Sequence, residues 1–289
     1  MDIQFLKSLV AVVEEGSIAG AARIQMITPA AVSQRIQALE REFGCLLLSR
    51  AGHKVKPTDA CNNMLPRTRR LIVESQALIG DVDGSGLTGT LRVGVISTAL
   101  TGLIPQALQG IESMAPSAKV HVIPGTSIEL YRAIQKNELD IAIMVLPPSI
   151  IPKSLRCRVL RSEPLMLIHH KSIKGSVSEI LQNNRYIRYD PLCWGGHLAN
   201  QFLQDQTIYT NPMFDLDSLE AITSLVSKSM GVSLVPSWAG LDLERSNLSA
   251  TIIKEAKYHR KLILMSPYHP VRPKLVDIFV ELLEEKIAS

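Results

Sequence analysis

The N-terminal segment has the spacing of apolar residues that an amphipathic helix requires. These residues fall at i, i+3, i+4 and i+7, namely Leu6, Leu9, Val10 and Val13. Residues at this spacing share one face of a helix, so the pattern predicts a helix over residues 1–15. Gly16 is expected to end it, because glycine readily adopts the left-handed conformation found after helix ends.

Two more helices are predicted after short breaks. Ser17 is a candidate N-cap for a short helix of about residues 17–24, which is rich in Gly and Ala and lets another helix approach closely. After a turn at residues 25–27, Thr28-Pro29 combines a capping hydroxyl with proline at the first helical position. The third helix is expected to run to about Glu42. Helix, short helix, three-residue turn and third helix is the spacing of a helix-turn-helix.

The outward face of the third predicted helix carries small, hydroxyl and amide side chains, not the Lys and Glu of an ordinary solvated face. The residues concerned are Pro29, Ala30, Ser33, Gln34 and Gln37. Glutamine can bond adenine N6 and N7, serine can bond a base or a phosphate, and small apolar groups can contact a thymine methyl. Arg35 is expected to contact phosphate. The alternative is a plain three-helix bundle with a polar outer face.

A β-hairpin is predicted after this helix. Residues 46–48 are expected to form a strand, residues 49–54 a turn and residues 55–56 the return strand. The turn carries Arg50, His53 and Lys54, and a cationic tip suits a minor groove or a phosphate.

The positive charge of the chain is concentrated at its start. The formal net charge of the 289 residues is +4. Residues 1–70 contain ten Lys and Arg against six Asp and Glu, an excess of four that equals the whole chain's. This placement is what a DNA-binding region requires.

At this point the segment resembles the DNA-binding half of the LysR-type transcriptional regulators. The resemblance is carried by AVVEEGSIAGAA, by ITPAAVSQRIQALEREFGCLLLSR and by VKPTDA. It is close over residues 1–70 and weaker over the whole chain, and it implies a winged helix-turn-helix that binds a double-stranded DNA operator. By position, it assigns Thr28, Pro29, Ser33, Gln34 and Arg35 to the recognition helix, and Arg50 and His53 to the wing. Cys61 departs from the family's usual glycine, which is expected to affect linker packing and not DNA contact.

A long helix is predicted from Thr58 to about Asp83, with Thr58 as its N-cap. Two series of apolar residues recur every seven positions, namely Met64, Leu71 and Leu78, and Leu65, Ile72 and Ile79. Adjacent heptad series favour packing against a second chain, and the family resemblance also implies a dimer or tetramer. The alternative is a helix buried against its own domain. Pro66 is expected to kink or weaken the helix.

The sequence Gly84-Ser85-Gly86-Leu87-Thr88-Gly89 matches the G-x-G-x-x-G pattern of dinucleotide-binding sites. That motif must follow a strand and open a helix. Here a predicted helix precedes it and a predicted strand follows, so a flexible hinge is the preferred interpretation.

Beyond residue 90, apolar strands alternate with helical stretches, which predicts parallel sheets in α/β layers, arranged in two lobes. The predicted strands are 91–96, 120–124, 140–146, 165–169, 186–189 and 232–235, and the predicted helices are 103–114, 127–137, 196–205, 218–230 and 274–288. The resemblance implies a two-lobed effector domain like a periplasmic binding protein, with crossings near 161–164 and 260–266. The expected domains are 1–58, 59–89 (linker helix and hinge) and 90–289, with lobe I at about 90–161 and 265–289 and lobe II at about 162–264.

Candidate effector-binding residues follow from the rule that ligands bind beyond the carboxyl ends of strands in open α/β sheets. The turns so nominated contain Ser97, Thr98, Thr101, Thr126, Ser127, Leu146, Pro191, Trp194 and Gly195. Hydroxyls and backbone N–H groups suit a carboxylate, and Trp194 can form an apolar wall, so the effector is expected to be a carboxylate or an aromatic molecule. A neutral effector stays open, and each hydroxyl can instead be an ordinary helix cap.

Other functions receive little support. There is no G-x-S-x-G, H-E-x-x-H or P-loop sequence, so neither an enzyme nor a cofactor is predicted. The four scattered cysteines are expected to be reduced thiols, not a disulfide or a zinc site. With no signal peptide or long apolar run, the chain is expected to be cytoplasmic, without membrane association. A solute-binding protein would explain the lobes but not residues 1–80.

Overall fold

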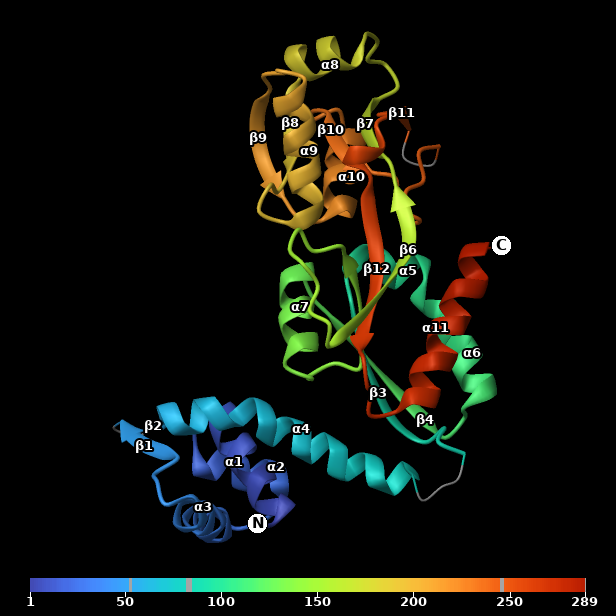
Figure 1. Ribbon diagram of the computed structural model, residues 1–289. Coiled ribbons are helices and arrows are strands. Elements are labelled where there is room, and N and C mark those ends of the chain that lie inside the picture. The colour runs from blue at the N-terminus through green and yellow to red at the C-terminus, as the bar shows by residue number, and fades with distance from the viewer. Residues whose placement is uncertain (52–53, 82–84, 245–246, 289) are drawn as a thin grey trace. The chain divides into compact units, whose positions relative to one another are not determined.

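The computed structural model describes residues 1–51, 54–81, 85–244 and 247–288 (Figure 1). The chain divides into two compact units, one built from Met1–Gly89 and the other from Thr90–Gln135 and Leu139–Ser289. Each unit is described by itself.

The first unit begins with three short helices whose ends are set by the predicted signals. Helices α1 (Ile3–Glu15), α2 (Ile18–Gln25) and α3 (Pro29–Phe43) follow one another closely. Gly16 has a φ of 63°, the left-handed conformation that ends α1. The Ser17 hydroxyl accepts a hydrogen bond from the Gly20 amide at 3.0 Å and so caps α2. The predicted helix-turn-helix is confirmed.

The core of this unit lies between the three helices and α4. Leu6, Leu9 and Val12 of α1 are buried, whereas Val10 and Val13 are only half-buried. The buried stripe is therefore rotated slightly from the one that the spacing indicated, because α1 packs against α4 as well as against α2 and α3. The buried residues of α3 are the inward-facing set of the predicted pattern, Val32, Ile36 and Leu39.

The predicted hairpin is present, but its strands lie later in the chain. Strands β1 (Leu48–Ala51) and β2 (Lys54–Pro57) pair antiparallel. Leu46 stays exposed and Leu47 is buried beneath the hairpin, so the strand predicted at 46–48 is placed wrongly. The Glu40 carboxylate accepts hydrogen bonds from the amides of Leu47 and Leu48, which holds this segment to α3 before β1 begins.

Helix α4 (Asp59–Asp81) follows the hairpin and contains Pro66 within its length. The Thr58 hydroxyl accepts from the Cys61 amide at 3.2 Å, which confirms the predicted cap. Buried Cys61 lies in the core of the first unit, and Met64, Leu65 and Ile72 pack against that core. Leu71 and Leu78 point elsewhere and are 41% and 64% exposed. Leu65 and Ile72 of one heptad series thus pack within the unit, as does Met64 of the other, whereas Leu71 and Leu78 do not.

The second unit contains two lobes. Lobe I is built on a five-stranded sheet in the order β4-β3-β5-β12-β6. Its strands are β3 (Gly89–Val95), β4 (Ala118–Pro124), β5 (Ile141–Val145), β6 (Leu155–Glu163) and β12 (Arg260–Pro267). Its helices are α5 (Ser97–Gly102), α6 (Ile104–Met114), α7 (Ser127–Gln135) and α11 (Pro273–Ala288). Helices α6 and α11 pack side by side along one side of the sheet, and α7 covers the other (Figure 1).

Lobe II carries helices on both faces of its strands. Its strands are β7 (Leu165–His170), β8 (Arg185–Tyr189), β9 (Asn211–Leu216), β10 (Ser233–Pro236) and β11 (Leu248–Ile252), and its helices are α8 (Val177–Asn183), α9 (Trp194–Asp205), α10 (Leu219–Ser227) and the 3-10 turn η1 (Ala256–Tyr258). Along β7, Leu165 and Leu167 pack with α8 and α9, while Met166 and Ile168 pack with α10. This alternation explains why the strand is apolar throughout.

The α/β class is confirmed, but the expectation of parallel sheets is wrong for part of the unit. Strands β10 and β11 both pair antiparallel with β7, and β12 pairs antiparallel with β5 and β6. Strand β6 leads out of lobe I and β12 returns to it, so neighbouring strands run in opposite directions. The sequence pattern did not predict β6, because arginines alternate with its apolar residues on a strand at the edge of the sheet.

Candidate functional site

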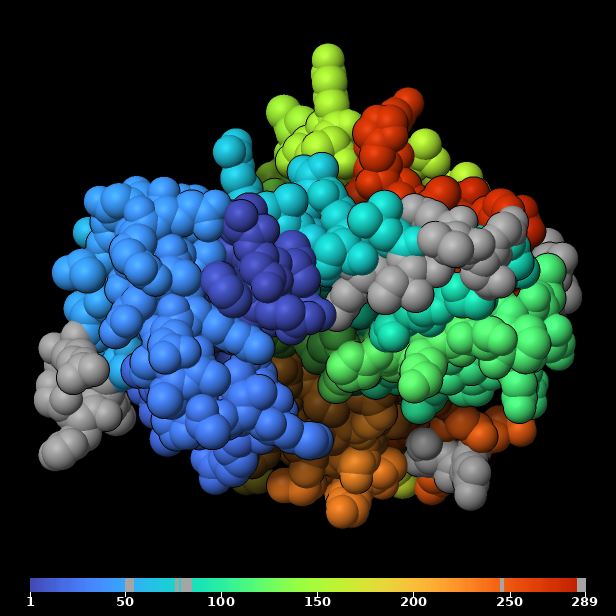
Figure 2. Space-filling model, turned by 90° about the horizontal axis from the view of Figure 1, so that it is seen from below, coloured from blue at the N-terminus to red at the C-terminus, as the bar shows by residue number. Residues whose placement is uncertain are grey.

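The outward side of α3 forms a surface of small and amide side chains, here called the recognition face. It consists of Thr28, Pro29, Ala30, Ser33, Gln34 and Gln37, of which only Ser33 is half-buried and the rest are exposed. Figure 2 views this unit from the side of α3, and the blue atoms of this part of the chain form a continuous outer surface there. The Thr28 hydroxyl accepts from the Ala31 amide at 3.2 Å, so its capping bond fixes where the face begins.

Arg35 is tied to the first helix. Its guanidinium donates to the hydroxyl of the buried Ser8 at 3.1 Å, and this hydroxyl also lies 2.7 Å from the side-chain oxygen of Gln25. One polar group of α1 thereby holds α2 and α3 together. A guanidinium has five N–H groups, so this bond fixes the orientation of Arg35 and leaves donors for a phosphate.

The predicted wing can be placed only by its backbone. In the hairpin, Arg50 pairs with Val55 and Ala51 with Lys54. His53, and the side chains of Arg50 and Lys54, lie outside the described residues. Their contact with DNA stays a prediction.

A polar cavity of about 330 Å³ lies between the lobes of the second unit. It brings together the predicted Ser97 and Thr98 after β3, Thr126 and Ser127 after β4, and Trp194 and Gly195 at the start of α9. The cavity is also lined by Ile96, Pro124, Gly125, Glu129, Val145, Tyr189, Cys193, Asp217, Leu219 and Arg260. Two turns far apart in the sequence therefore open onto one space.

Two of the hydroxyls that line this cavity, those of Thr126 and Ser127, also form hydrogen bonds within the protein. Thr126 and Glu129 form a reciprocal helix cap, since the Glu129 carboxylate accepts from the amide and the hydroxyl of Thr126, at 2.9 and 2.8 Å. These bonds lower the pKa of Glu129. The Ser127 hydroxyl accepts from the Val145 amide at 3.1 Å. The alternative of ordinary capping thus applies to Thr126.

A buried ion pair lies at the base of the polar cavity, which the sequence did not reveal. The Arg260 guanidinium donates to Glu163 at 2.7 Å and to the hydroxyl of buried Thr98 at 3.3 Å. Glu163 ends β6 and Arg260 begins β12, and the two residues are register partners. None of the nominated turns contains a basic residue. Arg260 comes instead from the crossing strand β12. The only sign of it in the sequence is a charged residue directly before the apolar residues of that strand.

The side chains of Cys193 and Tyr189 also line the polar cavity and are shielded from solvent. Burial raises the pKa of both side chains, and the Cys193 thiol donates to the Asp190 carbonyl at 2.8 Å. A Cβ at Gly195 would lie 2.5 Å from the Tyr189 hydroxyl, and one at Gly196 would overlap the Asp190 carbonyl. Glycines at these positions let α9 begin directly against the strand end.

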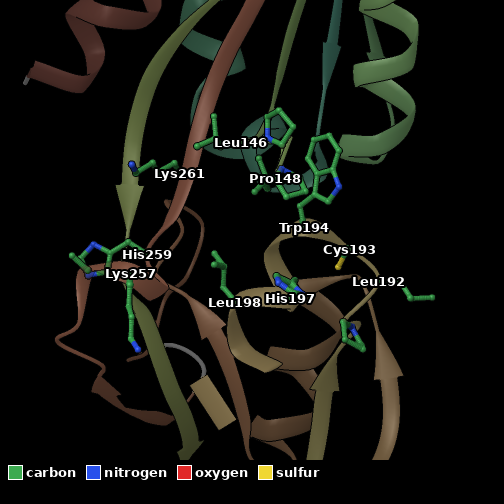
Figure 3. A pocket seen from close by; sticks show the side chains of 14 residues that line it. Leu146, Pro148, Leu192, Cys193, Trp194, His197, Leu198, Lys257, His259 and Lys261 are labelled. Carbon is green, nitrogen blue, oxygen red and sulfur yellow. The ribbon is translucent and has the colours of Figure 1, made fainter. Parts of the chain in front are cut away.

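A second, apolar cavity of about 470 Å³ adjoins the first and shares Val145, Cys193 and Trp194 with it (Figure 3). The predicted Leu146 and Pro191 line this apolar cavity, not the polar one. Thr101 lines neither, because its hydroxyl lies near Gly240 on lobe II. Within the described ranges, no group of three or more His, Cys, Asp or Glu side chains could hold a metal ion. No described helix is both long and apolar enough to cross a bilayer.

Comparison with protein families gives two matches that together span most of the chain. Residues 3–62 match the bacterial regulatory helix-turn-helix proteins of the lysR family, and residues 84–288 match the LysR substrate binding domain. The chain is a LysR-type transcriptional regulator. The resemblance seen in the sequence is thereby confirmed.

Relatives agree with this assignment, and solved structures share the fold, over most of the chain. The probable RuBisCO transcriptional regulator of Thalassiosira pseudonana is 27% identical over 96% of this chain and 95% of its own length. The ClcR regulator of Pseudomonas putida is 26% identical over 82% of this chain and 83% of its own. Full-length OxyR of Pseudomonas aeruginosa has a TM-score of 0.72 at 20% identity, covering 98% of this chain and 94% of that one. CbnR in complex with its target DNA has a TM-score of 0.67 at 18% identity, covering 99% and 100%.

The regulator therefore binds DNA through its first unit and carries an effector-binding domain in its second. Its substrate-binding-domain match includes both lobes and every residue that lines the polar cavity.

Proposed function

We propose that this regulator reads its operator with the recognition face of α3, as a dimer or tetramer, and that its effector is a small carboxylate bound in the polar cavity. In this proposal the chain works by binding DNA and a small molecule, and it does not turn over a substrate. The observation that carries the effector assignment is the convergence of hydroxyls from two turns on the start of α9, above buried Arg260.

The donors around the polar cavity favour an anion. Helix α9 has no side-chain cap at its N-terminus, so the amides of Trp194 and Gly195 are available to a ligand. Ser97 is exposed on the cavity wall. Arg260 is already neutralised by Glu163, so it contributes a directed N–H group more than a net charge.

The acids of the same cavity limit the charge of the effector. Glu129 is held by Thr126, but Asp217 is exposed and also lines the space. A second negative charge on the ligand would face this carboxylate, which favours a carboxylate with a single charge. A cationic group on the same ligand would find a partner in Asp217.

The sharpest test is Thr98→Val, which removes one buried hydroxyl and keeps the side-chain volume. The full-length chain would be screened with a panel of small carboxylic acids, with the thermal unfolding midpoint as the readout. We expect the acids that raise the midpoint of the unmodified chain to lose at least about tenfold in affinity in the variant, since a charged ligand loses a hydrogen bond. Operator affinity without an acid should not change.

Thr101→Val is the matched control on the same helix. It also removes a threonine hydroxyl, but from a residue that lines neither cavity. Equal losses in both variants, or full binding in Thr98→Val, would rule out the polar cavity as the carboxylate site.

The oligomer proposal rests on α4. Leu71 and Leu78 are seven residues apart on a helix of 23 residues, and both are exposed. Two apolar side chains at heptad spacing that do not pack within their own unit favour a partner helix. A symmetric dimer would place two recognition faces on an operator with matching symmetry.

A further inference from the structure

The apolar cavity has a composition that the proposed effector does not require. Its walls come from the loop after β5 (Leu146, Pro147, Pro148), from the start of α9 and from the crossing segment before and within β12. Figure 3 shows Leu146, Pro148 and Trp194 on one side of the space and His197 and Leu198 on the other. Prolines have a fixed φ, so this wall is formed before any ligand arrives.

Apart from the Cys193 thiol, the ionisable side chains that line this cavity are all basic. They are His197, Lys257, His259 and Lys261, and the lining contains no carboxylate. Lys257 is neutralised by Asp205 at 2.6 Å, and the His259 ring lies 3.2 Å from the Ser162 hydroxyl. Among the described residues, Lys261 has no carboxylate within ion-pair distance. The ammonium group of Lys261 therefore offers a positive charge to a ligand in this cavity.

Side chains from opposite faces of strand β12 line the two cavities. Side chains alternate along a strand, so Arg260 and its neighbour Lys261 point to opposite faces of β12. Arg260 is buried at the base of the polar cavity with its acid partner, and Lys261 is exposed on the apolar one. The carbonyl of Lys261 accepts from the Leu146 amide at 2.9 Å, which fixes the apolar wall to the same strand.

Trp194 separates the two spaces. Its indole packs edge-on against the Tyr131 ring of α7, with the ring centres 5.7 Å apart. This contact holds the indole as a shared wall, one side of which faces the hydroxyls and the other the prolines and leucines. A flat apolar ligand has a stacking surface on the apolar side.

We propose that the apolar cavity is a second binding site of this regulator, for an organic monoanion with a flat apolar body such as an aromatic carboxylate. The apolar walls bury the body of the ligand, and Lys261 attracts its charge. Because the walls belong to both lobes and to the crossing segment, an occupied site links the lobes independently of the polar cavity.

The test uses three naphthalene derivatives of similar shape and different charge: 2-naphthoate, 2-naphthamide and 2-naphthylmethylammonium. Each is titrated calorimetrically into the full-length chain at low ionic strength. The anion should bind about fivefold tighter than the neutral amide, and the cation weakest, as expected for attraction by partly exposed charges. Equal affinity for the three compounds, or no binding of the anion, would overturn the proposal.

Substitutions of two exposed rim residues test the location of the site without disturbing the fold. Lys261→Gln should weaken 2-naphthoate about fivefold and leave 2-naphthamide unchanged. His197→Glu should reverse the preference, so that the cation binds tighter than the anion. The matched controls are Lys254→Gln, at an exposed lysine of the same crossing segment, and Gln204→Glu, at an exposed position of α9, since neither residue lines the cavity.

Thr98→Val distinguishes the two cavities. It should leave 2-naphthoate binding intact, because Thr98 lines only the polar cavity. Loss of 2-naphthoate binding in Thr98→Val, with normal binding in Lys261→Gln, would place the anion in the polar cavity and refute a second site.

Discussion

The two units of this regulator build their sites in different ways. The recognition face comes from nine consecutive positions on one helix and the residue that caps it. The polar cavity joins side chains as distant as Thr98 and Arg260, which are 162 positions apart. A site on one helix inherits its geometry from local hydrogen bonds and helix periodicity. The geometry of a site between lobes depends on the strands that run from one lobe to the other. It therefore depends on contacts between residues far apart in the sequence.

The units also differ in how polar groups are buried within them. The first unit buries a neutral hydroxyl, Ser8, between an arginine and a glutamine at its edges. The second buries a complete ion pair, Arg260 with Glu163, at the place where both crossing strands meet. Burying charge is costly unless the pair is intact, so the second unit should be the more sensitive to loss of one partner.

Glu163→Gln tests this difference and should have the largest effect. It leaves the Arg260 charge buried without its partner, and we expect the free energy of unfolding of the second unit to fall by about 3–5 kcal/mol. Both tryptophans and all six tyrosines of the chain lie in the second unit. Tryptophan fluorescence during urea unfolding therefore follows this unit, and the helical signal of the first unit should be unchanged.

An exposed pair in the same unit serves as the control. Arg158 and Glu284 lie 2.8 Å apart with about half of each side chain exposed, so Arg158→Gln should cost less than about 1 kcal/mol. A similar loss in both variants would mean that burial does not distinguish the two pairs.

The first unit could be predicted almost completely from the sequence, because its signals are local. Gly16, Ser17, Thr28 and Thr58 each end or begin a helix through a bond to a residue within four positions or through a left-handed turn. The error in the hairpin has a long-range cause. Glu40 binds the amides that follow Cys45 and delays the start of β1, and apolar pattern alone carries no sign of that bond.

The second unit could be predicted only in outline. The turns after β3 and β4 were found because the ends of strands are the usual place for ligands, and they do meet at one cavity. Arg260 and Asp217 were missed, since they come from a crossing strand and a loop with no motif of their own. Tyr189 was missed because only the turn after its strand, and not the strand end itself, was nominated. Leu146 and Pro191 were grouped with the polar residues, although they line a different space.

Leu71→Asp tests whether α4 connects two first units. A charge placed in an apolar seam would have to be buried in both copies, so we expect the dimer dissociation constant to rise at least about a hundredfold, or nearly 3 kcal/mol. Sedimentation velocity would then show monomers. Asn63→Asp adds the same charge at an exposed position of the same helix outside both heptad series and should leave the mass unchanged. Dimers that survive Leu71→Asp would mean that this seam is not the interface.

Gln34→Ala tests the recognition face with a smaller effect. Loss of a bidentate contact to a base should weaken operator binding by about 1–3 kcal/mol and leave binding to unrelated DNA nearly unchanged. Arg35→Gln is the contrasting variant, because loss of a phosphate contact should weaken binding to both DNAs and reduce its salt dependence. Competition binding with the two DNAs separates these results. Equal weakening on both DNAs by Gln34→Ala would reassign this residue to the phosphate backbone.

The smallest effects come from one helix cap in each unit. Ser17→Ala removes the bond to the Gly20 amide in the first unit, and Ser176→Ala removes the capping box with Glu179 in the second. Each should lower the free energy of unfolding of its own unit by about 1 kcal/mol, since a cap satisfies only one or two amides. Tryptophan fluorescence should detect Ser176→Ala and not Ser17→Ala, whereas helical circular dichroism should detect both. A shift of the fluorescence transition in Ser17→Ala would show that the two units unfold together, and the Glu163→Gln result would then have to be assigned to the whole chain.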